Sequence, residues 1–272
     1  MTAIVSTLTS LPFTQLRRNR YFYLWYDGFY AAVCVTLLVA MAAAHHQPLL
    51  QRWDYRWLVL LPLLCHAQIL CSVYIHNCTH NNFPRAVNRL VGELCGVVVL
   101  TRFASWEVIH QRHHRYTDDV GKDPHPVVPG YWTFLVKTIV GVEKQLQRIY
   151  FDLYGDTPEN HRYERVRAYV SYATNILLVA TWYTFLGPIA FFCFFVPSSI
   201  VGFLHLVHFN WSTHDAFSPA KNFRPINIDS GFYRIGNVLW HGIYMHANHH
   251  QRANMFNPAH LQGGQMLTIP GE

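Results

Sequence analysis

The sequence predicts an all-α integral membrane protein, with four membrane-spanning helices and a cytosolic helical cap in a single domain, residues 1–272. Of its 272 residues, 51% are hydrophobic and 13% are charged, whereas about a quarter of an average soluble domain is charged. Long apolar runs alternate with polar segments that are rich in histidine. The mean hydropathy of +0.08 is low for a chain lying wholly in a bilayer, so we expect a sizeable polar part.

The apolar runs define the expected spans, because a helix of roughly 20 residues crosses a hydrocarbon core of about 30 Å. The first covers residues 23–44 and follows an aromatic cluster typical of a membrane interface. The second covers residues 57–76. The stretch from Val170 to Asn210 is too long for one crossing, and Gly187-Pro188 predicts a turn inside it. The last two spans are therefore expected at 169–186 and 189–209.

The charge distribution predicts the orientation. Basic residues gather before the first span and in the segment from Arg102 to Arg167, while the loops near His45 and Gly187 carry little charge. The positive-inside rule then puts both termini and the cap (77–168 and 210–272) in the cytoplasm, most simply at a bacterial inner membrane. It also explains the net charge of +6, so no nucleic-acid partner is expected. The run VGELCGVVVL from Val91 is too short to span and predicts a helix lying in the interface.

Three histidine clusters lie in the polar segments. HNCTH spaces two histidines at i and i+4, and HQRHH and HANHH each space three at i, i+3 and i+4, so each cluster forms one helical face. FNWSTH adds an asparagine and a histidine at i and i+4. Imidazole binds iron, zinc, copper and nickel, and eight imidazoles exceed what one ion can hold. The clusters therefore predict two metal ions, held by His76, His80, His110, His113, His114, His246, His249 and His250.

HNCTHNNF, HQRHHRYTDDVGKDPH and HANHH resemble the three histidine boxes of the membrane fatty acid desaturase and hydroxylase superfamily, and FNWSTH is similar to the Asn-x-x-x-His element of its stearoyl-CoA desaturase branch. The resemblance covers roughly residues 55 to 255. It implies a mushroom-shaped helical protein with a cytosolic non-haem diiron centre and O2-dependent attack on a C–H bond. It adds His214 to the ligands, with Asn210 as a weaker or water-mediated one. QRANMFNP after the third box, and Asn77 and Thr79 in the first, depart from the usual pattern and bear on the substrate subclass.

Carboxylates near the histidines are expected to accept the free ring N–H groups of the ligands, because two cations bound by neutral imidazoles need nearby anions. Asp123 is the first candidate, since Pro124 fixes the chain beside it. Asp118, Asp119 and Glu107 are the others. His208 could line the substrate path, and His125 is not counted as a ligand.

The resemblance implies a desaturase that acts on a fatty acyl chain in the membrane and uses two iron ions and O2. The six cysteines show no iron–sulfur framework. Electrons must therefore come from a separate donor of the ferredoxin, rubredoxin or cytochrome b5 type, with its reductase. An acidic donor could dock on a basic patch formed by Arg112, Arg115, Lys122, Arg148, Arg162 and Arg165.

Two alternatives stay open on the sequence. One is a hydroxylase or ketolase of the same superfamily acting on a lipid or carotenoid, favoured by the run His214-Asp215-Ala216-Phe217 and separable by product mass. The other is a non-enzymatic membrane protein that binds metal or haem. A transporter would place histidines within its spans, where His66 alone is clearly mid-span. An acyl thioester, a glycerolipid, a free acid and a carotenoid ring all suit an apolar tunnel.

Overall fold

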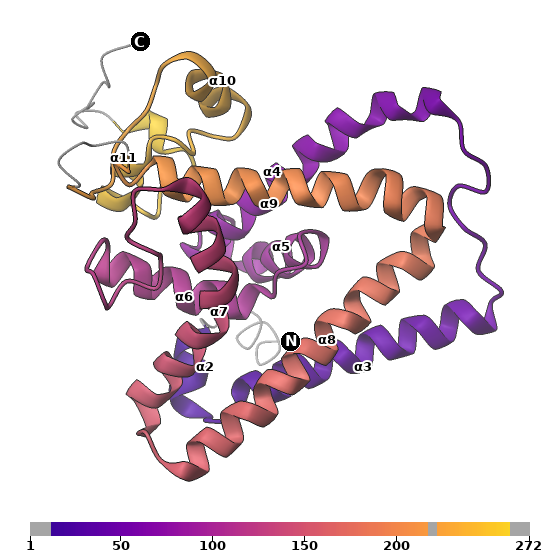
Figure 1. Cartoon of the computed structure of the whole chain (residues 1–272), viewed down its shortest axis with the longest axis horizontal. Helices are drawn as coiled ribbons and strands as arrows, with labels where there is room; N and C mark the ends of the chain where they lie inside the picture. Colours follow the sequence, from indigo (N-terminus) through magenta and orange to yellow (C-terminus); the bar gives the residue numbers. More distant parts are fainter. Residues whose placement is uncertain (1–11, 217–221, 262–272) are drawn as a thin grey trace.

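The computed structural model describes residues 12–216 and 222–261. Within these ranges the regular secondary structure is helical, apart from an isolated bridge between Asn227 and Met245. The elements are α2 (Pro12–Arg18), α3 (Phe22–Ala43), η1 (Tyr55–Leu60), α4 (Leu61–Thr79), α5 (Arg85–Val98), α6 (Phe103–Tyr116), α7 (Tyr131–Tyr154), α8 (Pro158–Ala190), η2 (Phe191–Phe195), α9 (Val196–Ser212), α10 (Gly231–Leu239), α11 (His246–Gln251) and η3 (Pro258–His260). α3, α4, α8 and α9 extend toward one side, and α6, α7, α10 and α11 gather at the opposite end (Figure 1).

Three helical stretches of the described chain are long and apolar enough to cross a membrane: Phe22–Ala43, Tyr55–Thr79 and Pro158–Ser212. The third has 55 residues and is broken at Gly187, where φ is 75°. A Cβ atom there would lie 2.5 Å from Pro48 Cβ, so both the backbone and the space favour glycine. This break lies where the Gly-Pro pair predicts it. The count of four spans and the cytoplasmic side of the cap stay predictions, and both chain ends lie outside the described residues.

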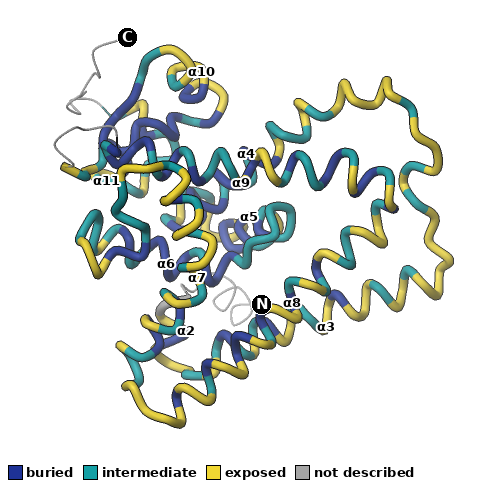
Figure 2. Tube along the Cα trace, in the orientation of Figure 1, coloured by how far each residue is buried: buried dark blue, intermediate teal, exposed yellow. Residues whose placement is uncertain are grey.

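The candidate spans expose apolar side chains on their outer surfaces. Trp25, Val39 and Ile176 are each more than 60% exposed, and α3 and α8 are exposed along most of their length (Figure 2). Such a surface is unfavourable in water and favourable against lipid acyl chains. α3 packs against α8, and α4 packs against α9.

α8 differs from the span predicted at 169–186, because it begins at Pro158 and runs unbroken from the cap into the apolar stretch. Thr157 caps the start of α8 by accepting a hydrogen bond from the Asn160 backbone N–H. The polar first half is held by ion pairs of the buried Arg167 with Glu164 and with the partly exposed Glu143 of α7. Hydropathy marks only the lipid-facing half of such a helix.

α5 begins at Arg85, before the expected start at Val91, because Pro84 allows a helix to start after it but not to continue through it. Val87, Leu90 and Leu94 form an exposed apolar stripe at helical spacing. The stripe suits a membrane interface, and that location stays a prediction.

Candidate metal centre

Nine histidines from four distant segments meet at the end of the molecule where α6, α7, α10 and α11 gather. α6 and α11 carry three each on one face, and His76 lies in the last turn of α4. His80 directly follows α4 as its C-cap, and His214 lies in the turn after α9. These nine are the predicted histidine ligands, and they fall into two groups. Their members are His76, His80, His110, His114 and His249 in the first, and His113, His214, His246 and His250 in the second.

Local packing fixes the short α11. The backbone N–H of Asn248 donates to Asn227 Oδ1 at 3.1 Å, and the Asn227 amide donates back to Asn248 Oδ1 at 2.7 Å. Ile228 donates from its backbone to Tyr244 at 3.0 Å, and both side chains are buried. A helix of six residues is unstable alone, so these contacts determine where its histidines point.

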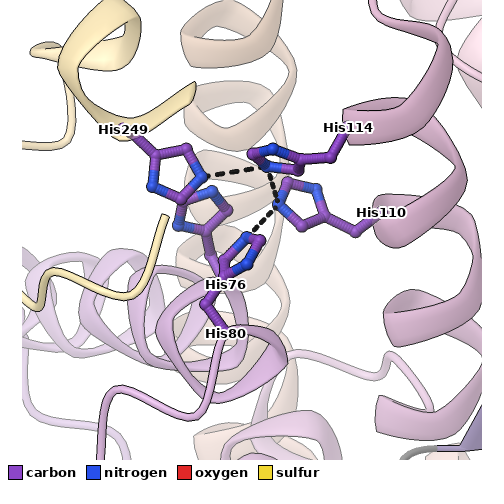
Figure 3. Close-up of side chains that lie close together, drawn as sticks. All are labelled: His76, His80, His110, His114 and His249. Atoms are coloured by element: carbon purple, nitrogen blue, oxygen red, sulfur yellow. Dashed lines mark hydrogen bonds between the residues drawn. The ribbon is translucent and has the colours of Figure 1, made fainter. Parts of the chain in front are cut away.

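In the first group, one ring nitrogen of each residue lies within 4.8 Å of those of the others. The Nε2 of His110 lies 3.0 Å from His80 Nε2 and 3.1 Å from His114 Nε2, and His114 Nε2 lies 3.0 Å from His249 Nε2. His76 is 2% exposed, and both its ring nitrogens lack a hydrogen-bond partner. Figure 3 shows the five rings, from α4, α6 and α11, turned toward one another.

This arrangement fits a bound cation. A neutral imidazole has one N–H donor and one acceptor nitrogen, so His110 Nε2 and His114 Nε2 cannot each bond to two further Nε2 atoms. Several ring lone pairs therefore face one another in a buried space. Protonation of the rings would not resolve these contacts, because burial and the neighbouring rings hold the pKa of His80 and His114 at about 3. A metal ion among these nitrogens would satisfy all of them.

The second group repeats the pattern. His246 Nε2 lies 3.1 Å from the Nε2 atoms of both His214 and His250. His113 Nε2 is buried without a partner, and its ligand atom lies within 4.8 Å of those of the other three. Burial, and then nearby rings, lower the pKa values of His113 and His246 well below their usual range. The lowered pKa values favour neutral rings at His113 and His246, as metal ligation requires.

Two aspartates and a threonine contact the far nitrogens of the second group. His113 Nδ1 lies 2.9 Å from both carboxylate oxygens of Asp123, and His214 Nδ1 lies 3.0 Å from Asp118 Oδ2. His250 Nδ1 lies 3.3 Å from Thr117 Oγ1. A partner at Nδ1 directs Nε2 toward a metal and fixes the ring orientation. Burial raises the pKa of Asp123 to about 8, and a cation bound through His113 would favour the ionised carboxylate.

Other predicted residues lie elsewhere. Glu107 is buried but pairs with Arg89 at 2.7 Å and not with a histidine ring. Asp119 accepts a hydrogen bond from Lys122, near the surface. The His208 ring lies among Tyr131, Trp211 and Tyr233.

Asn210 lies beside the site. Its Nδ2 donates to the Leu206 carbonyl, while its Oδ1 is buried without a partner. Phe217, the last residue of the run at 214–217, lies outside the described residues. Of the expected basic patch, Arg115, Lys122, Arg148, Arg162 and Arg165 are exposed, whereas Arg112 pairs with Asp152 at 2.6 Å.

Two residues near the histidines carry little signal in the sequence. The His125 ring stacks on His113, with centroids 3.9 Å apart, and its Nδ1 is buried without a partner. The Trp106 ring stacks on His110 at 5.4 Å. Trp106 precedes His110 by four residues, so the helical period of the second box could have revealed it. No sequence period connects His125 to His113.

Comparison with known proteins shows which family this chain belongs to. The family model for fatty acid desaturases matches residues 55–256, which include all nine histidines. The chain belongs to the fatty acid desaturase family. With its three candidate membrane-crossing stretches, this desaturase family member is an integral membrane protein.

Individual relatives match a smaller part of this desaturase family member. It is 36% identical over 72 residues to an sn-1 oleoyl-lipid 12-desaturase of Picosynechococcus sp., and 34% identical over 67 residues to one of Anabaena variabilis. These matches cover 25% and 23% of this chain and 21% and 19% of the relatives, about a fifth of their length. No solved structure matches the chain.

Proposed function

We propose that this protein is a membrane-bound, O2-dependent desaturase that introduces a double bond into a fatty acyl chain. The observation that carries the proposal is the convergence of nine histidines into two adjacent groups, in a chain of the fatty acid desaturase family. Both named relatives are lipid desaturases. A structural metal protein would not need unpaired ring nitrogens from four segments beside a cavity.

The two groups would each hold one iron ion, with Asn210 Oδ1 as a direct or water-mediated ligand. Imidazole nitrogens suit iron, and the shared burial keeps water away from the site. When bound, the two irons supply the oxidising power for removing hydrogen from an unactivated C–H bond with O2. The reaction balances when the acyl chain gives up two hydrogens, two electrons and two protons enter from outside, and O2 leaves as two waters.

The chain's own residues position the site and the substrate. Asp123 and Asp118 hold the rings of His113 and His214 in place through their Nδ1 atoms. Trp106 stacks on His110 and limits its rotation. Such fixed geometry matters because a displacement of about 1 Å can lower a rate on the order of a hundredfold.

Electrons would come from a separate small donor of the ferredoxin, rubredoxin or cytochrome b5 type and its reductase. The six cysteines are all free, and Cys34 and Cys78 are buried. The exposed Arg115, Arg148 and Arg165 offer positive charge for an acidic donor. We propose that they face the cytoplasm, as the positive-inside rule predicts.

Mass spectrometry of lipids from a bacterial host tests the proposal. The host expresses the wild-type chain or His110→Ala, which removes a central ring of the first group. We expect acyl chains lighter by two hydrogens in the wild type alone, with fragment ions locating the new bond. A histidine-dependent gain of one oxygen would instead assign the hydroxylase or ketolase branch. Identical lipids in both hosts, with both proteins in the membrane, would contradict both oxygen-dependent activities on the host's lipids.

A further inference from the structure

A cavity of about 310 Å³ lies between α6, α7, α8 and α9, next to the metal centre. Its volume falls within the range of small-molecule sites, about 300–1,000 Å³. Trp106, His125 and Asn210 line its inner end and link it to the histidines. Along α7, the lining runs from Phe134 to Leu146, a distance of about 18 Å at roughly 1.5 Å per residue.

Six buried polar atoms without a hydrogen-bond partner belong to residues that line this cavity, and one of them, Arg102 Nε, is ion-paired with Asp27 at 2.7 Å. The other five are Trp106 Nε1, His125 Nδ1, Thr138 Oγ1, Gln145 Oε1 and Asn210 Oδ1. Roughly 90% or more of buried polar groups in proteins have a hydrogen-bond partner, so an occupant must supply partners here. The remaining lining is largely apolar, from residues such as Phe134, Leu146 and Val207, and its two charged residues, Arg102 and Glu143, are held in ion pairs with Asp27 and Arg167. The occupant therefore combines an apolar chain with groups that can form hydrogen bonds.

The outer lining shows where the cavity opens. Ile139 and Val142 of α7, Tyr172 of α8 and Phe203 of α9 all line it and are 40–58% exposed. Tyr172 and Phe203 belong to the stretch Pro158–Ser212, which is apolar enough to cross a membrane.

α7 continues this surface with a membrane-facing pattern. Trp132, Val136 and Val140 are exposed at helical spacing, with Lys137 and Lys144 beside them. Long basic side chains and exposed aromatics are typical of helices at a bilayer interface. The opening between α7, α8 and α9 therefore faces lipid.

We propose that this cavity takes its substrate laterally from the bilayer, and that the substrate is an ester-linked acyl lipid. The acyl chain would extend inward toward Trp106, His125 and Asn210, where bound water would supply the hydrogen-bond partners that the chain cannot. The ester carbonyl would accept a hydrogen bond from the Thr138 hydroxyl, and a head-group hydroxyl or a bound water would donate to Gln145 Oε1. The inference rests on the proposed desaturase function and names the carrier of the acyl chain. A soluble acyl thioester would instead need a path from water.

A second cavity does not fit this role. It measures about 510 Å³ and lies between η1, α4, α8 and η2. None of its described lining residues is a histidine, so a chain bound there alone would not reach the metal centre.

Photo-crosslinking tests the proposal without turnover. The purified chain is placed in phosphatidylglycerol nanodiscs that contain phosphatidylcholine with a mid-chain diazirine. We expect labelled peptides around Trp106 and around Phe203 to Val207. Thr138→Trp fills the cavity and should abolish this labelling. Val136→Trp is the matched control, because Val136 lies on the same helix, is 57% exposed and is not a lining residue. It should leave the labelling unchanged.

Each outcome decides the proposal. Labelling of the wild-type protein that is confined to outward residues such as Ile176 would overturn the proposal. This result does not depend on whether Thr138→Trp folds. Preferred labelling by a diazirine acyl-coenzyme A added from water would overturn the bilayer source. Equal labelling by an ether-linked probe, which lacks the carbonyl, would overturn the ester assignment.

Crosslinking also separates this inference from the function. Cavity labelling equal in His110→Ala and wild type, with no lipid product, would refute the desaturase while supporting the site. A histidine-dependent product without cavity labelling would support the desaturase and refute the cavity as the substrate site.

Discussion

His113 and Asp123 form a buried pair in which the ring Nδ1 lies 2.9 Å from both carboxylate oxygens. The backbone N–H groups of Asp118 and His125 also donate to this carboxylate, at 2.6 and 2.7 Å. Asp123 thus joins the loop after α6 to a ring of the second histidine group. The other ring nitrogen of His113 has no partner, which leaves it free to bind a metal.

Asp123→Asn should lower metal affinity about 10–100-fold, the usual effect of losing a partner of a metal-bound histidine. The amide has one acceptor oxygen where the carboxylate has two, and the ring and two backbone donors compete for it. Metal content after dialysis against a metal buffer, measured by inductively coupled plasma mass spectrometry, checks this. Asp119→Asn is the control, since Asp119 pairs with exposed Lys122. Equal metal content in both variants would contradict the role of Asp123.

His80→Ala and His214→Ala should each reduce the metal content from about two ions per chain to about one. His80 belongs only to the first group and His214 only to the second, so each substitution leaves the other group complete. Metal content per chain and the circular dichroism of each folded variant measure this. Loss of all metal in both variants would show that the groups act as a single site.

Helical spacing predicts which histidines face together, because positions i, i+3 and i+4 share a face regardless of tertiary structure. It does not predict their division between two groups. His113 and His114 are neighbours in α6, yet they fall in different groups. That division depends on how α4, α11 and the turn after α9 approach α6, which involves contacts distant in sequence.

The sequence is equally limited in predicting which carboxylates contact the histidine rings. Asp118, Asp119, Asp123 and Glu107 are equivalent candidates by distance along the chain. In the structure, Asp118 contacts His214, which lies 96 residues away, and it does so with a positive φ of 59°. Glu107 pairs with Arg89, which lies 18 residues away, at 2.7 Å. Partners that are distant in sequence determine which carboxylate contacts a ring, so the local sequence alone cannot predict it.

Removal of bound metal should make the stability of the protein strongly dependent on pH. The pKa values of His80, His114 and His125 are lowered to about 3, while unfolded histidine titrates at about 6.5. The unfolded chain therefore binds more protons between these values, and stability falls as pH drops below about 6.5. Each histidine contributes on the order of 1.4 kcal/mol per pH unit.

Asp123 acts in the opposite direction, because its raised pKa lets the folded chain hold a proton up to a pH of about 8, and burial raises the pKa of Glu107 as well. These two carboxyls do not offset the larger number of buried histidines. Melting of the chelator-treated protein in detergent should therefore give a lower midpoint at pH 5 than at pH 7. A midpoint that is constant or rises toward pH 5 would contradict burial of neutral rings.

Gly92→Val should destabilise the protein by about 1–3 kcal/mol, the usual cost of overpacking. A Cβ atom at Gly92 would lie 2.6–2.7 Å from three atoms of the Phe103 ring, which is fully buried at the start of α6. Displacing Phe103 would shift the helix that carries His110. We expect a lower melting temperature and lower metal retention, measured on the detergent-purified protein.

Gly141→Val in α7 is the matched control, because a Cβ atom there meets nothing within 4 Å. Valine is a better helix former than glycine, so this variant should melt at the wild-type temperature or slightly above it. The double variant Gly92→Val, Phe103→Leu should recover part of the lost stability, since the smaller side chain makes room for the new one. Additive losses in the double variant would show that Gly92 and Phe103 do not interact. The position of the second histidine cluster would then depend on other contacts of α6, such as the hydrogen bond from the Tyr23 hydroxyl to the Ala104 carbonyl at 3.0 Å.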